Sequence, residues 1–251
     1  MLDFSHNELR STIPSEIANI NGLKMIMLGS NTLSGTIPSQ LGTLSNLKTL
    51  DLGGNHLSGF IPNSFSGLWN IDILILEENK IKGSIPTAIG ELTTLTQLKL
   101  NGNELSGTIP TSFGNLDKLM WLLLSANKLN GTIPSELGKL SMVNSLWLNY
   151  NNLTGSIPYE IGLMNGLIIL YLDANNLTGT MPSSFGMLSL LTSLTLQNNE
   201  FNGTIPSEMG MMFSLTYLDI SENSLTGSVP DQICVNGVEV HPPVAVACSC
   251  C

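Results

Sequence analysis

The chain has few charged residues, and most of them are acidic. Charged side chains make up 11% of its 251 residues, and 19 acidic against 9 basic groups give a net charge of −10 at pH 7. Nucleic acids and anionic membranes attract proteins through basic surfaces, so we expect neither as a partner. No apolar run reaches the roughly 18 residues that a membrane-spanning helix needs, so we expect no membrane contact within this chain.

Motifs for catalysis and cofactor binding are missing. The three histidines, His6, His56 and His241, are far apart in the sequence, and none has metal-ligand spacing or a neighbouring nucleophile that would suggest a catalytic triad. The 24 glycines form no Gly-x-x-x-x-Gly-Lys phosphate-binding loop, and no kinase signature is present. We therefore expect no enzyme, no catalytic residue, no metal and no cofactor in this chain.

Cysteine is absent before Cys234, and the other three cysteines are Cys248, Cys250 and Cys251. Cysteines confined to one end predict a disulfide-linked cap, which in turn indicates the secretory route or the cell surface. Four cysteines allow three pairings. A bridge between Cys250 and Cys251 would be strained, which favours Cys234 paired with one of the later three. The alternative is a Cys-x-Cys-Cys metal knuckle, but it lacks a second ligand pair at zinc spacing.

An asparagine recurs every 24 residues throughout the chain. Its positions are Asn7, Asn31, Asn55, Asn79, Asn103, Asn127, Asn151, Asn175, Asn199 and Asn223. Leucines precede and follow it at nearly fixed spacing, as in Leu47-x-x-Leu50-x-Leu52-x-x-Asn55-x-Leu57. A Gly-x-Ile-Pro block comes next, so ten of the 12 prolines share one phase. This strict period with this pattern is similar to the leucine-rich repeat.

Each repeat predicts one coil of an α/β, right-handed solenoid. Leu50 and Leu52 alternate with polar neighbours, which indicates a short strand with one buried face. Strands of successive coils form a parallel, concave sheet, and the stretch from Pro62 to Leu68 predicts a 3₁₀ or single α turn on the convex side. The asparagines should form a hydrogen-bonded ladder. The expected core positions in one coil are Leu47, Leu50, Leu52, Leu57, Ile61, Phe65 and Leu68.

The Leu-Ser/Thr-Gly-x-Ile-Pro block resembles plant-type leucine-rich repeats, as in receptor-kinase ectodomains, receptor-like proteins and polygalacturonase-inhibiting proteins. The resemblance covers residues 1–231 in about ten repeats, and residues 232–251 would form the cysteine-rich cap, which resembles the caps of algal, diatom-like members. No signal peptide follows Met1, and the chain opens midway through a repeat strand. Since terminal coils need a polar cover, we expect a truncated N-terminus.

Outward positions of the concave strands carry apolar and aromatic side chains where polar ones are expected. Trp147 and Tyr171 share one phase in adjacent coils, so their rings should lie about 5 Å apart, close enough to stack. An exposed apolar patch with a polar rim is typical of a protein-binding site, although β-strand surfaces also favour such residues. The candidate ligand-binding residues are Ile73, Ile75, Lys99, Trp121, Leu123, Trp147, Tyr150, Ile169, Tyr171 and Asp173.

Four Asn-x-Ser/Thr sequons agree with a secreted or surface protein: Asn130, Asn152, Asn176 and Asn202. The repeat consensus also produces such sequons for structural reasons. Taken together, these patterns predict an extracellular recognition module for a protein or peptide ligand, with roles in signalling or defence. The resemblance implies the ectodomain of a receptor-like protein, with a co-receptor as a further partner.

Two alternatives remain open at the level of the sequence. The first is a secreted inhibitor of polysaccharide-degrading enzymes, which shares the same repeat. The second is an ice-binding protein, because serine and threonine recur in columns, for example at the positions of Ser106 and Thr108. The consensus itself supplies those hydroxyl groups, which weakens the second alternative.

Overall fold

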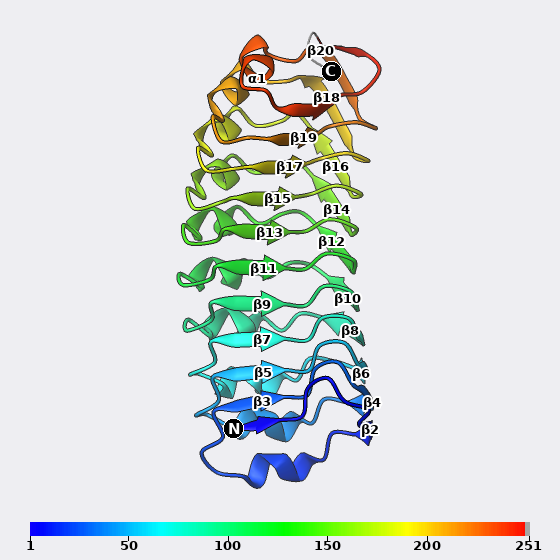
Figure 1. The fold of residues 1–251 in the computed structure, drawn as a ribbon, viewed down its shortest axis with the longest axis vertical. Helices are drawn as coiled ribbons and strands as arrows, with labels where there is room; N and C mark the ends of the chain where they lie inside the picture. Colours follow the sequence, from blue (N-terminus) through cyan, green and yellow to red (C-terminus); the bar gives the residue numbers. More distant parts are fainter. Residues whose placement is uncertain (249–251) are drawn as a thin grey trace. The chain divides into compact units, whose positions relative to one another are not determined.

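The computed structural model of the protein describes residues 1–248, which form two compact units. The first unit is Met1–Leu129, and the second begins at Asn130. In each unit, one 24-residue repeat makes one coil with two short strands and a short helical turn. The predicted solenoid of parallel strands and 3₁₀ turns is confirmed in both units (Figure 1).

The odd-numbered strands form the first sheet, in which neighbouring strands pair in parallel. In the first unit these strands are β1 Leu2–Asp3, β3 Met25–Met27, β5 Thr49–Asp51, β7 Ile73–Ile75, β9 Gln97–Lys99 and β11 Trp121–Leu123. In the second unit they are β13 Ser145–Trp147, β15 Ile169–Tyr171, β17 Ser193–Thr195, β19 Tyr217–Asp219 and β21 Glu239–His241. This is the sheet that the sequence predicted.

The even-numbered strands form a second parallel sheet, which the sequence did not predict. In the first unit they are β2 Arg10–Thr12, β4 Thr32–Thr36, β6 His56–Gly59, β8 Lys80–Ser84 and β10 Glu104–Gly107, and β12 Lys128–Gly131 includes the boundary between the units. In the second unit they are β14 Asn152–Gly155, β16 Asn176–Gly179, β18 Glu200–Thr204, β20 Ser224–Ser228 and β22 Val246–Ala247. Most of these strands contain the repeat glycine in a left-handed conformation, for example Gly59 with φ 80°.

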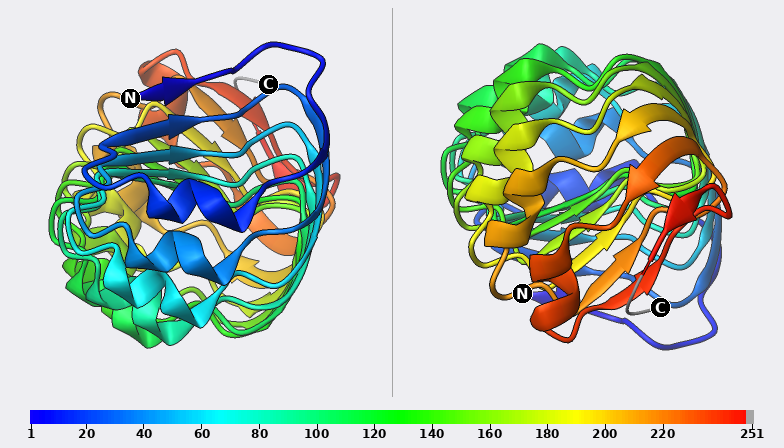
Figure 2. Two further views of the ribbon diagram at one scale, coloured as in Figure 1. Left: turned by 90° about the horizontal axis from the view of Figure 1, so that it is seen from below. Right: turned by 90° about the horizontal axis from the view of Figure 1, so that it is seen from above.

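A 3₁₀ turn follows the repeat proline in each regular coil, and Figure 2 shows these turns side by side within each unit. They are η1 Ser15–Asn19, η2 Ser39–Thr43, η3 Asn63–Gly67, η4 Thr87–Glu91, η5 Thr111–Asn115, η6 Ser135–Lys139, η7 Tyr159–Leu163, η8 Ser183–Met187 and η9 Ser207–Met211. Proline at the N-cap has no N–H to satisfy, and its carbonyl opens the turn: Phe65 N–H donates to Pro62 O at 3.0 Å. The corresponding turn after Pro230 is the short helix α1, Asp231–Val235.

The repeated asparagines form the expected ladder. Asn55 Nδ2 donates to Leu52 O at 3.1 Å within its own coil and to Leu28 O of the preceding coil at 3.0 Å. Asn55 Oδ1 accepts from Leu33 N of that preceding coil at 2.9 Å. The side chain therefore satisfies backbone groups that the turns leave unpaired, at a position that is only 5% exposed.

The seven predicted core positions of the third coil are all buried, and Phe65 is fully so. Beyond the regular repeats, β21 and β22 extend the two sheets of the second unit, with Val240 paired to Leu218 and Val246 paired to Gly227. Cys234 and Cys248 are disulfide-bonded. Cys250 and Cys251, on which the predicted pairing also depends, lie outside the described residues.

Candidate ligand-binding surface

The first sheet presents two side chains per strand on the face away from the core. In β13, for example, Leu146 is fully buried while Ser145 and Trp147 are partly exposed. The same alternation recurs in nearly every strand of this sheet, so the sequence assigned the outward positions correctly. The predicted ligand-binding residues fall in two groups, one in each unit.

The first-unit patch consists of Ile73, Ile75, Lys99, Trp121 and Leu123, on β7, β9 and β11. Gln97 separates Ile73 from Trp121 in register, and Lys99 separates Ile75 from Leu123. The Lys99 ammonium lies 4.9 Å from the centroid of the Trp121 ring, a cation–π contact that fixes both side chains. Leu123 is only 7% exposed, so the expectation of an accessible Leu123 is wrong: its neighbours cover it.

The second-unit patch consists of Trp147, Tyr150, Ile169, Tyr171 and Asp173. The rings of Trp147 and Tyr171 have centroids 5.5 Å apart, which confirms that the two residues are in contact. Tyr150 is 60% exposed and stands at a left-handed position with φ 54°, next to the ladder asparagine. Ile169 is the register partner of Ser145 and Ser193, whose small side chains leave it partly exposed.

Asp173 departs from its predicted role on an exposed rim, because it is only 4% exposed. Thr195 Oγ1 donates to Asp173 Oδ1 at 2.5 Å, and Asn149 Nδ2 approaches Asp173 Oδ2 at 3.5 Å. Burial raises the pKa of Asp173 above its ordinary value, and the Thr195 hydroxyl opposes this shift. Close by in the repeat, Asn149 Oδ1 and Trp147 Nε1 are buried without a hydrogen-bond partner among residues 1–248. The side chains of Trp147, Asn149 and Asp173 thus bury several polar atoms, of which two lack a hydrogen-bond partner among these residues.

A second aromatic pair, Tyr217 and His241, was missed by the sequence as a candidate site. Their ring centroids are 5.5 Å apart on neighbouring strands β19 and β21. Burial raises the pKa of the Tyr217 hydroxyl, and the nearby Asp219 and Glu239 carboxylates add to the shift. His241 lies beyond the last regular repeat, where the 24-residue period no longer gives the register. A local strand pattern at Glu239–His241 is the only signal that could have found it.

The first unit also contains a pocket of approximately 380 Å³ on the first sheet, which we call the glycine pocket. Its lining residues are Ser5, His6, Met27, Gly29, Ser30, Asp51, Gly53, Gly54, Ile75, Glu77, Glu78 and Lys99. It adjoins the first-unit patch through Ile75 and Lys99. The sequence missed it because the pocket depends on small residues in two neighbouring coils, Gly29-Ser30 and Gly53-Gly54, followed by Glu77-Glu78 in the next coil.

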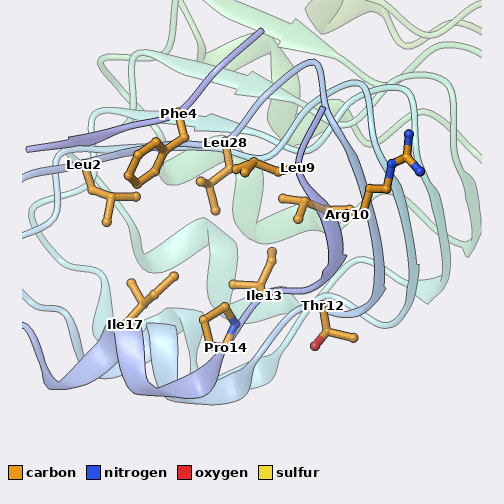
Figure 3. Close-up of a pocket in the computed structure, with 10 residues that line it drawn as sticks. Leu2, Phe4, Leu9, Arg10, Thr12, Ile13, Pro14, Ile17 and Leu28 are labelled. Carbon is orange, nitrogen blue, oxygen red and sulfur yellow. The ribbon is translucent and has the colours of Figure 1, made fainter. Parts of the chain in front are cut away.

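A further cavity of approximately 330 Å³ lies against the first coils of the first unit. Figure 3 shows Leu2, Phe4, Ile17 and Leu28 around this cavity, with Arg10 at its edge. Most of these apolar residues occupy the inward positions of the repeat. The core pattern therefore explains this apolar lining without a ligand.

Residues 1–248 contain neither a candidate metal site nor a candidate membrane-spanning helix. No group of three or more His, Cys, Asp or Glu side chains within this range could hold a metal ion. No helix in the same range is both long and apolar enough to cross a membrane. The four sequon asparagines are all exposed, and they lie on the second sheet, in β12, β14, β16 and β18.

Sequence comparison identifies the repeat. A "Leucine rich repeat" family model matches residues 21–81 and 165–225, and a second model of that description matches residues 1–20, 94–116, 118–140 and 142–164. The chain belongs to the leucine-rich-repeat family. No curated protein gives a significant match to the sequence of this leucine-rich-repeat chain.

Solved leucine-rich-repeat structures resemble the chain over nearly all of its length. The plant peptide hormone receptor RGFR1, solved in complex with RGF2, is 36% identical with a TM-score of 0.93, over 96% of this chain and 39% of that chain. The Arabidopsis receptor kinase HAESA, in complex with the peptide hormone IDA and the co-receptor SERK1, is 32% identical with a TM-score of 0.93, over 99% of this chain and 42% of that one. This chain therefore spans about two fifths of the length of these receptors.

A plant ice-binding protein is also similar. It is 27% identical with a TM-score of 0.79, and the match covers 98% of this chain and 81% of that chain. The similarity to plant-type members of the family is therefore confirmed, and it includes relatives with different functions. The choice between those functions depends on the outward residues, because the consensus residues only build the coil.

Proposed function

We propose that this chain is a non-catalytic recognition module, extracellular or on the cell surface, that binds a peptide or protein ligand on its first sheet. In finer detail, we propose that it is part of the ectodomain of a receptor-like protein, with a co-receptor as a second partner. RGFR1 and HAESA, two of the similar structures, are solved in complex with peptide hormones, and HAESA also with a co-receptor.

The observation that carries this proposal is the contact between Trp147 and Tyr171 on a sheet face outside the core. Large aromatic side chains supply much of the energy of protein interfaces, and they act best when a ligand removes them from water. The partly exposed Ile169 and the exposed Tyr150 extend the apolar surface of the same unit. In the first unit, Trp121 with Lys99 offers a comparable anchor.

The test uses a displayed library of random peptides selected on the immobilised chain. Each selected peptide is then measured against Trp147→Ala, Tyr171→Ala and Trp121→Ala. We expect losses of about 2 kcal/mol or more at an anchor residue, which is about 30-fold in affinity. The matched control is Trp69→Ala, because Trp69 is 66% exposed but lies outside the strands of the first sheet. The proposal fails if selected peptides bind all three variants as tightly as the parent.

The first alternative is an inhibitor of polysaccharide-degrading enzymes. In that case the aromatic residues of the first sheet would contact the enzyme. It predicts inhibition of a secreted glycosidase by the purified chain, and loss of that inhibition in the aromatic variants. Inhibition that survives in those variants would instead place the contact elsewhere on the molecule.

Ice binding is the second alternative, and the match to the plant ice-binding protein favours it. The hydroxyl column at the position of Ser106 argues against it. Ser58 Oγ donates to Gly35 O at 3.1 Å, and Thr226 Oγ1 donates to Gly203 O at 3.2 Å, so these hydroxyls bond the preceding coil. Lys80, Lys82 and Glu104 also place charges on this sheet. An assay of ice recrystallisation inhibition decides the point.

The remaining expectations belong to the same proposal. We propose that residues 1–231 form the solenoid and residues 232–251 its cysteine-rich cap. The exposure of Asn130, Asn152, Asn176 and Asn202 supports glycosylation in the secretory pathway. The disulfide-bonded state of Cys234 and Cys248 supports the same oxidising compartment.

A further inference from the structure

The glycine pocket owes its shape to missing side chains. Just before the ladder asparagine, the second coil has Gly29-Ser30 and the third coil has Gly53-Gly54, whereas the fourth coil has Glu77-Glu78. A Cβ on Gly54 would lie in ordinary van der Waals contact with Ser30, whose nearest atom would be 3.5 Å away, so a side chain at position 54 would meet no clash at its first carbon. The two small pairs thus leave a hollow, with the two glutamates forming one wall.

Chemically, this pocket combines an apolar floor with excess negative charge. Met27 and Ile75 contribute the apolar side chains, and the polar lining comes from the acids Asp51, Glu77 and Glu78 and from Lys99, His6, Ser5 and Ser30. The Glu78 carboxylate extends toward the following coil, because a Cβ on Gly102 would clash with Glu78 Oε1. The Lys99 ammonium is held over the Trp121 ring and forms no ion pair with a described residue. A group of positive charge would therefore find unpaired carboxylates here.

The carboxylate of Asp51 is held in position at the base of the pocket. Its Oδ1 atom accepts from Gly53 N at 3.0 Å, and the missing side chain of Gly29 makes room for it, because a Cβ there would lie 2.8 Å from Oδ1. The second oxygen, Oδ2, has no hydrogen-bond partner among residues 1–248, and neither carboxylate of Glu77 and Glu78 has one. The half-buried Asp51 therefore presents a fixed acceptor to the pocket.

We infer that the glycine pocket binds the basic side chain of a peptide ligand, an arginine in particular. A guanidinium has donors for two carboxylates at once, and its aliphatic stem would pack on Met27 and Ile75. A metal ion is disfavoured, because no three acidic, His or Cys groups in the described range converge. The net charge of −10 also attracts a basic peptide from a distance. This inference rests on the proposed peptide-binding function and deepens it, because the pocket adjoins the first-unit patch.

The test follows the backbone amides of Gly53 and Gly54 by NMR while N-acetyl-arginine amide is added to the full chain. We expect saturable shifts of these amides, weakened by salt. N-acetyl-citrulline amide, which has the same shape without the charge, should leave them unchanged. Equal shifts with the citrulline probe, or none with the arginine probe, would overturn the inference.

Three variants locate the binding. Asp51→Asn keeps the acceptor for Gly53 N but removes the charge, and should weaken the arginine probe about tenfold. Gly54→Asn fills the pocket and should abolish binding. It should fold, because Asn198 occupies the same repeat position with φ 54°, close to the φ of 61° at Gly54. Asp117→Asn, at an exposed acid that does not line the pocket, is the control and should bind like the parent.

The titration and the peptide selection together separate this inference from the proposed function. If the arginine probe does not bind but selected peptides still require Trp121, only the pocket assignment is wrong. If the probe binds as expected but no peptide depends on the aromatic residues, the pocket stands and the proposed peptide-binding function is wrong.

Discussion

Trp147 and Tyr171 are register partners on β13 and β15, and their rings meet at an interplanar angle of 31°. Tilted aromatic pairs of this kind contribute about 0.5–1.5 kcal/mol beyond the area that they bury. The pair lies on the face of the sheet away from the core. Its contribution to folding should therefore be small compared with that of the residues behind it.

The neighbouring residues Trp147 and Leu148 should accordingly separate binding from stability. Leu148 is fully buried, so Leu148→Ala should lower the free energy of unfolding by roughly 2–5 kcal/mol through the cavity that it leaves. Trp147→Ala should lower it by only about 1 kcal/mol, because the aromatic contact is the main loss. Urea denaturation of both variants measures the difference. Equal losses would show that the Trp147 ring belongs to the core.

The asparagine ladder makes a second prediction. Asn79 makes four hydrogen bonds to backbone groups of two coils, whereas Asn7 is exposed and makes two bonds within its own coil. Asn79→Ala should lower the free energy of unfolding by about 3 kcal/mol, because it leaves buried carbonyl and N–H groups without hydrogen-bond partners. Asn7→Ala is the matched control, and we expect it to cost less than about 1 kcal/mol. Thermal denaturation of the pair gives the comparison, and a similar cost for both would contradict the ladder's role.

The raised pKa of Asp173 predicts that this residue makes the protein less stable as pH rises. Its folded pKa is raised above the ordinary 3.8, so the unfolded chain loses this proton first as pH increases. Ionisation of Asp173 therefore lowers stability as pH rises from 3.8 through the folded pKa, and the cost persists at neutral pH. Below 3.8 the carboxyl is protonated in both states and contributes no such cost.

Asp173→Asn should therefore raise the melting temperature at neutral pH. The new amide still accepts from Thr195 Oγ1. Asn149 Nδ2 faces Asp173 Oδ2 in the parent, so a half-turn of the Asn149 amide brings Asn149 Oδ1, which has no partner in the described part of the chain, to the new N–H groups. The gain over the parent should shrink in acid. Asp117→Asn, at an exposed position, serves as the control. A gain that is the same at all pH values would show that charge burial is not its cause.

Glycosylation gives the fourth prediction. The chain secreted from a eukaryotic host should carry N-glycans on the second sheet, visible as a mass decrease after enzymatic deglycosylation. Asn→Gln variants at Asn130, Asn152, Asn176 and Asn202 assign each glycan. Because the candidate ligand surface is on the first sheet, peptide binding should not change when the glycans are removed. Reduced binding after deglycosylation would place the ligand on the second sheet.

Periodicity predicted the features that repeat. The phase of Asn55 located the ladder, the alternation at Leu50 and Leu52 located the first sheet, and Pro62 located the start of a 3₁₀ turn. These features depend on local patterns that recur in every coil. The second sheet was missed because its strands contain a turn-forming glycine, as at Gly59, which indicates a turn rather than a strand.

Features that depend on differences between coils could not be predicted in this way. Leu123 and Asp173 were expected to be accessible, but the side chains around them cover both. The glycine pocket was missed because it results from two consecutive coils with small residues, Gly29-Ser30 and Gly53-Gly54, beside a coil with Glu77-Glu78. Such features require the side chains of several coils to be placed together, which a consensus repeat does not describe.

The ladder also gives every coil a direction. Asn31 bonds back to Leu9 N and Phe4 O, and Asn223 bonds back to Phe201 N and Leu196 O in the same way. A coil therefore has two unlike faces, and the trailing face of one matches the leading face of any other. Removing or duplicating 24 residues, or a multiple of 24, rejoins matching faces, whereas other lengths shift the asparagines and leucines out of phase with those of the next coil. A gene that encodes this repeat can therefore gain or lose whole coils without requiring a new type of contact between coils. The outward residues are then free to diversify.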